Sequence, residues 1–187
     1  MRSHAITGML FIITGLTPLL FYGLIGPDGP LNLLEAKPSE TIAAWLWLCL
    51  PIALMRTTDA MRGGAGFEYV KTGFLLVTIV AAAGLVHDAF GTNPNNVGLA
   101  YGREAISGIV IPAMMLGLGI TGIGFIIQKY YQRWLSILIT VFAVYGFFAT
   151  ALLGASAEED SIILAPFWFG FPIVFIAWGI VTILKKD

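Results

Sequence analysis

Charged residues and cysteine are both scarce in this chain. Of its 187 residues 11% are charged and 58% are hydrophobic, whereas a soluble domain has roughly 25% charged residues. Cys49 is the only cysteine, which excludes an internal disulfide bond, a Cys-x-x-Cys redox pair and a site with four thiolate ligands. A net charge of −1 gives no basic field of the kind that attracts nucleic acid. We therefore expect no nucleic-acid partner.

Catalytic motifs are also missing. The sequence contains neither a His-Glu-x-x-His pair for zinc nor a Gly-x-Ser-x-Gly turn for a nucleophilic serine. Its two histidines, His4 and His87, fall on opposite sides of the membrane in the topology given below, so they cannot both hold one haem. We assign no catalytic residue and no metal ligand, the cofactor stays unknown, and an enzyme is the weakest of the functional classes considered.

Long apolar runs, by contrast, are abundant. Six segments approach the roughly 20 residues that cross a bilayer as a helix, and they cover residues 5–25, 41–58, 72–88, 105–128, 134–154 and 161–184. Breakers rich in glycine, proline and asparagine separate several of them, for example residues 26–30 and 91–96. All connections are short. We therefore predict an all-α bundle of six transmembrane helices that forms one domain over residues 1–187, with no soluble domain.

Lysine and arginine are distributed unevenly between the two sides of this predicted bundle. Two of the ten, Lys37 and Arg103, fall on one side, and eight fall on the side of both termini, namely Arg2, Arg56, Arg62, Lys71, Lys129, Arg133, Lys185 and Lys186. Short cytoplasmic loops retain positive charge, so both termini are predicted to be cytoplasmic. We expect a multi-pass protein of a prokaryotic cytoplasmic membrane.

Polar residues that could bind a ligand or an ion gather at the predicted outer ends of two runs. His87 and Asp88 end the third run, and Arg103 and Glu104 precede the fourth. The connecting loop should bring them together. They would form either a site for a cation or a proton, or a salt-bridge cluster that closes the hairpin, with Glu104 placed well at a helix N-terminus.

An acidic run of Glu158, Glu159 and Asp160 precedes the sixth segment. It either attracts cations to an outer vestibule or complements the dipole of the following helix. No charged residue is expected near the middle of the membrane, which argues against a proton relay built from carboxylates there.

Small residues mark one face of the fourth run. Ala113, Gly117 and Thr121 recur every four residues and predict a seam where another helix approaches closely. Such seams serve packing more often than permeation. The fifth and sixth runs are rich in aromatic residues, which suits contact with a lipid or a pigment as well as ordinary packing.

These features favour a non-catalytic membrane subunit or a self-associating membrane protein that acts through helix packing, with lipid or pigment contact as an option. The expected partners are the lipid bilayer and other membrane subunits or copies of the same chain. One alternative is a small channel or transporter whose acidic outer vestibule attracts cations. Another is an enzyme that modifies a lipid or a quinone at the outer interface through His87 and Asp88.

Overall fold

All regular elements in the described part of the chain are α-helices. The computed structural model describes residues 3–27, 29–93, 95–153 and 162–185, and its helices are α1 (Ser3–Phe21), α2 (Ala36–Trp47), α3 (Cys49–Ala60), α4 (Phe67–Gly91), α5 (Val97–Gln128), α6 (Arg133–Leu153) and α7 (Ala165–Leu184). Because α2 and α3 together make one span, six helical segments are long and apolar enough to cross a membrane. The protein is an all-α bundle of transmembrane helices, as predicted.

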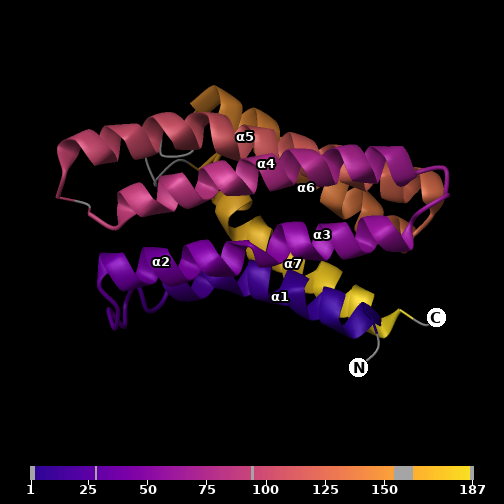
Figure 1. The fold of residues 1–187 in the computed structure, drawn as a ribbon, viewed down its shortest axis with the longest axis horizontal. Coiled ribbons are helices and arrows are strands. Elements are labelled where there is room, and N and C mark those ends of the chain that lie inside the picture. The colour runs from indigo at the N-terminus through magenta and orange to yellow at the C-terminus, as the bar shows by residue number, and fades with distance from the viewer. Residues whose placement is uncertain (1–2, 28, 94, 154–161, 186–187) are drawn as a thin grey trace.

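The helices lie side by side along the long axis of the molecule (Figure 1). The most extensive contacts join α4 to α5, α1 to α7 and α5 to α6, and α3 contacts both α1 and α4. Figure 1 shows the two chain ends at one end of the bundle, together with the α3–α4 and α5–α6 connections, while the α1–α2 and α4–α5 connections lie at the opposite end. We call these the terminal end and the distal end.

The second span consists of two consecutive helices, α2 and α3, instead of one continuous helix. Pro51 has no N–H to donate to the Trp47 carbonyl, and its ring would collide with that carbonyl in an unbroken helix. The chain accordingly leaves the helix at Leu48 and resumes it at Cys49. The span begins at Ala36, where the sequence led us to expect a start at residue 41, so the segment just before residue 41 is helical.

Several other helix ends also differ from the ends of the apolar runs. α4 continues to Gly91 and α5 begins at Val97, so the loop between them is shorter than expected. The side chain of Asn96 caps α5 by accepting a hydrogen bond from the Leu99 amide at 3.2 Å. α1, in contrast, ends at Phe21, ahead of the glycine- and proline-rich breaker.

Glycines allow neighbouring helices to approach closely. A Cβ atom on Gly73 of α4 would lie 2.1 Å from the Thr121 hydroxyl and 2.4 Å from the Gly117 carbonyl of α5. Gly8 of α1 and Gly179 of α7 face each other in the same way, since a Cβ on Gly8 would lie 2.4 Å from the Gly179 carbonyl. Any larger side chain at these positions would force the helices apart.

One side chain of α5 ties the terminal-end turn between α3 and α4. The amide of Gln128 donates to the Met61 carbonyl and accepts from the Gly66 N–H, each at 3.2 Å. Met61 and Gly66 are the capping residues of α3 and α4. Within the turn, Gly63 has a φ of +81°, a left-handed conformation that favours glycine.

Aromatic side chains fill the space among α1, α5 and α7. Trp178 is fully buried, its ring stacks on Phe11 with 4.0 Å between centroids, and Phe125 meets it edge-on at 5.4 Å. Seven buried threonines each donate their hydroxyl to the carbonyl four residues earlier in the same helix, namely Thr14, Thr17, Thr57, Thr58, Thr121, Thr150 and Thr182.

The contact between α4 and α5 can be tested with two glycines of the same helix. We expect Gly73→Ala to lower the free energy of unfolding by about 1–3 kcal/mol, because its methyl group would overlap Thr121 and Gly117. Gly84→Ala is the matched control, since a Cβ there meets nothing within 4 Å. Unfolding by sodium dodecyl sulfate, followed by circular dichroism, measures both. Equal stability of the two variants would contradict the proposed close packing.

Candidate functional site

Charged side chains from three helices meet at the distal end. α2 carries Glu40, α4 carries His87 and Asp88, and α5 carries Arg103. Arg103 Nη2 donates to Glu40 Oε1 at 2.7 Å, and His87 Nδ1 lies 2.8 Å from Asp88 Oδ1. The hydroxyl of Tyr22, just after α1, donates to Glu40 Oε2 at 3.3 Å. We call these five residues the distal cluster.

The acids of the distal cluster are more deeply buried than its bases. The side chains of Glu40 and Asp88 are 9% and 10% exposed, against 34% for Arg103 and 20% for His87. A carboxylate withdrawn from water needs an opposite charge or hydrogen-bond donors close by, and the guanidinium and the tyrosine hydroxyl supply them to Glu40. The polar network therefore stabilises a charge that the apolar surroundings alone would not tolerate.

Gly91 makes room for the ion pair between α2 and α5. A Cβ atom on Gly91 would lie 2.8 Å from Glu40 Oε1 and 2.9 Å from Arg103 Cζ. The ion pair thus passes directly over the backbone of α4 at its last residue. A side chain in place of Gly91 would push Glu40 and Arg103 away from their present positions.

A groove of about 370 Å³ opens beside the distal cluster, between α2 and α4. The polar residues that line it are Glu40, Asp88, Thr41 and Thr92. The rest of the lining is apolar and consists of Ala44, Trp45, Leu48, Leu85 and Ala89. Trp45 is 65% exposed, so the apolar wall is open to the surroundings of the bundle. The groove therefore combines two carboxylates with a surface suited to a hydrocarbon chain.

The structure brings together three of the four distal residues that the sequence singled out. His87, Asp88 and Arg103 all belong to the distal cluster, whereas Glu104 is exposed on α5. Because α5 begins at Val97, Glu104 lies within the helix and not at its N-terminus. The helix dipole therefore does not explain its position.

Other acidic residues differ in how the structure bears on them. Glu158, Glu159 and Asp160 lie outside the described residues. Glu40, the most connected residue of the distal cluster, directly precedes the apolar run 41–58, so the sequence-based prediction leaves it in the connection before the second span. Pro38 was the available signal, because proline is favoured in the first turn of a helix and thus marks a helix start ahead of Glu40.

The small-residue seam of α5 faces the inside of the bundle. Gly117 and Thr121 contact Gly73 of α4, while Ala113 is half-buried. Neither Gly117 nor Thr121 is accessible to a helix from another protein. The seam joins two helices of this chain.

The aromatic residues of α6 and α7 divide between core and surface. Phe142, Phe167 and Phe171 are buried and pack on one another, whereas Phe148 and Phe169 are exposed. The hydroxyl of Tyr145 donates to the Ile163 carbonyl. Part of the aromatic set therefore packs inside the bundle, and part remains exposed on its surface.

Among the described residues, no three His, Cys, Asp or Glu side chains lie close enough together to hold a metal ion. No family model, curated protein or solved structure matches the chain. The class that the structure itself defines is a helical, multi-pass membrane protein. What it does must be argued from the distal cluster and its groove.

The ion pair between Glu40 and Arg103 should matter for stability. We expect Glu40→Gln to lower the free energy of unfolding by about 1–3 kcal/mol, because Arg103 loses its charge partner. Because the Arg103 side chain is partly exposed, the expected loss of stability is smaller than for a fully buried ion pair. Asp59→Asn breaks the exposed pair with Arg62 at the other end and should change stability by less than about 0.5 kcal/mol. If both variants unfold at the same detergent concentration, Glu40 has no structural role.

Proposed function

We propose that this chain is a non-catalytic integral membrane protein that binds an amphiphile with a cationic head group in the groove between α2 and α4. The observation that carries the proposal is the presence of two buried carboxylates, Glu40 and Asp88, in a groove whose wall is otherwise apolar. The head group would lie against the carboxylates. The hydrocarbon part would follow Trp45 and Leu48.

The charge of the distal end supports a cationic ligand. In the part of the chain that the structure describes, this end carries the acids Glu35, Glu40, Asp88 and Glu104 but only two cations, Lys37 and Arg103. Opposite charges within about 4–6 Å favour each other's charged form. A head group with a positive charge or several N–H donors fits this environment better than an anionic one.

The interior of the bundle supports binding at its end more than transport through it. Seven buried threonines donate to their own helix backbone, for example Thr14, Thr57 and Thr121, and aromatic rings fill the space among α1, α5 and α7. A permeation path needs polar groups aimed at the pathway. The distal groove instead faces outward beside the bundle, where a molecule already in the lipid can enter it.

Self-association through the seam of α5 forms no part of this proposal, because Gly117 and Thr121 already contact α4. Other membrane subunits or further copies of the chain would have to bind the outer faces of the helices. Reproducible copurification of one companion protein in mild detergent would support such a complex.

The ligand class can be tested with small amphiphiles. In neutral maltoside detergent, the part of the intrinsic fluorescence that Trp45 contributes should change saturably with decyltrimethylammonium but not with decyl sulfate, because Trp45 lines the groove. Trp45→Phe should abolish the signal. Asp88→Asn should weaken binding roughly tenfold, the loss expected for one charged contact. Glu104→Gln, which neutralises an exposed acid outside the groove, should bind normally. The proposal would be contradicted if Asp88→Asn and Glu104→Gln weakened binding equally. It would also be contradicted if decyl sulfate bound in the groove as well as decyltrimethylammonium does.

We further propose that the terminal end faces the cytoplasm of a prokaryotic cell. Its described cations are Arg56, Arg62, Lys71, Lys129, Arg133 and Lys185, against two acids, Asp59 and Glu68, and short cytoplasmic loops retain such positive charge. Green fluorescent protein folds and fluoresces in the cytoplasm, whereas alkaline phosphatase becomes active only outside it. Fusions to either chain end should therefore fluoresce and lack phosphatase activity. Opposite results at the two ends would be incompatible with an even number of crossings.

A further inference from the structure

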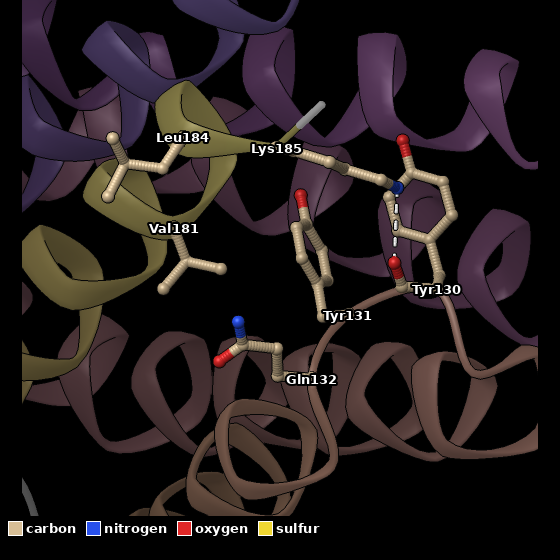
Figure 2. Close-up of a pocket in the computed structure, with 6 residues that line it drawn as sticks. All are labelled: Tyr130, Tyr131, Gln132, Val181, Leu184 and Lys185. Carbon is tan, nitrogen blue, oxygen red and sulfur yellow. Dashed lines mark hydrogen bonds between the residues drawn. The ribbon is translucent and has the colours of Figure 1, made fainter. Parts of the chain in front are cut away.

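A second pocket lies at the terminal end, far from the distal cluster along the bundle. It occupies about 170 Å³ between the end of α7 and the short connection from α5 to α6 (Figure 2). Its lining consists of Tyr130, Tyr131, Gln132, Val181, Leu184 and Lys185. None of these residues takes part in the proposed binding of a cationic amphiphile.

Lys185 provides a positive charge at this pocket. Its Nζ donates to the Tyr130 carbonyl at 3.0 Å and lies 3.0 Å from the centre of the Tyr130 ring, as Figure 2 shows. An ammonium group has three N–H donors, so the carbonyl leaves further donors for a ligand. Burial lowers the pKa of Lys185 to about 8. An anion beside it would favour its charged form.

Gln132 provides a second donor group. Its Oε1 accepts a hydrogen bond from Trp134 Nε1 at 2.5 Å. This bond orients the amide, and Figure 2 shows the amide nitrogen facing the space between Tyr131 and Val181. The residues that line the pocket therefore offer an ammonium and an amide N–H₂ group on either side of the Tyr131 side chain (Figure 2), and each group can donate to an oxygen atom of an anion.

The other side of the pocket is apolar and continues onto the surface of a membrane span. Val181 and Leu184 belong to the last turn of α7, and the Leu184 side chain is largely exposed. The exposed Trp134 lies nearby at the start of α6, and tryptophan is enriched at the head-group level of membranes. A ligand here would have its polar part at the interface and its hydrocarbon part along α7.

We propose that this pocket binds the phosphodiester head group of an anionic phospholipid. The Lys185 ammonium and the Gln132 amide donate to phosphate oxygens, and one acyl chain lies along Val181 and Leu184. The excess of cations at the terminal end, including Arg133 directly after Gln132 in the sequence, favours an anionic over a zwitterionic lipid. The inference does not depend on the ligand of the distal groove.

The test uses the full chain, delipidated in neutral maltoside detergent and titrated with dioctanoyl phosphatidylglycerol. Native mass spectrometry should show saturable binding of this lipid, weaker binding of dioctanoyl phosphatidylcholine and no competition by inorganic phosphate. Lys185→Gln should weaken phosphatidylglycerol binding roughly tenfold, the loss expected for one charged hydrogen bond. Lys71→Gln removes an exposed charge from the same end, outside the pocket, and should bind like the unchanged protein.

Two further variants keep the test decisive. Lys185→Arg retains the charge and should retain most of the binding, while Gln132→Ala should weaken it even if Lys185→Gln fails to fold. Equal weakening by Lys71→Gln and Lys185→Gln would overturn the pocket in favour of diffuse charge. Full competition by inorganic phosphate would overturn the lipid in favour of a free anion. Asp88→Asn should leave phosphatidylglycerol binding unchanged. The lipid pocket at the terminal end and the amphiphile groove at the distal end can therefore be refuted independently of each other.

Discussion

In a bilayer, apolar side chains gain little by leaving lipid for one another, so close packing between helix backbones has to hold this bundle together. Gly73 against Gly117, and Gly8 against Gly179, bring two pairs of helices into direct backbone contact. Larger side chains are thereby restricted to the spaces between these seams, where Trp178 and its aromatic neighbours lie. The glycines thus decide which helix faces are consumed internally and which remain for lipid or ligands.

This kind of packing leaves little polar chemistry in the described interior. Most of the buried threonines donate to their own helices, and the buried charges of the distal end lie beside a groove. The ion pair of Glu40 with Arg103 adds little stability relative to an apolar pair of similar size, because withdrawing both charges from water offsets much of their attraction, although removing only one of the two partners is costly. Its burial is better explained by a role in holding a carboxylate at a fixed place in the groove.

The sequence was sufficient for the overall architecture because length and apolarity fix a membrane span almost without reference to tertiary contacts. It was not sufficient for Glu40. A hydropathy reading treats Lys37 to Glu40 as a polar loop, whereas the helix there is anchored by a tertiary bond from the Ser39 hydroxyl to the Phe21 carbonyl at 2.8 Å. Glu104 shows the complementary error, since its environment depends on α5 starting at Val97.

The seam of α5 was likewise predictable from the sequence only in part. The spacing of Gly117 and Thr121 predicts that some helix approaches them, because small residues at intervals of four lie on one face. The spacing does not say whether that helix belongs to the same chain. Only the position of Gly73 answers this, and Gly73 stands in α4 without any comparable pattern around it. Partner surfaces of membrane helices are therefore harder to predict than the helices themselves.

The length of α5 relates the two proposed sites to the membrane. Arg103 lies near its start and Lys129 just after its end, and a helical rise of 1.5 Å per residue separates them by about 39 Å. A bilayer measures roughly 40–45 Å when its head-group regions are included. The distal groove and the terminal pocket therefore lie near the head groups of opposite leaflets. At that depth water and lipid head groups can screen a charge while the neighbouring hydrocarbon accepts an apolar chain, which is the environment that an amphiphile requires.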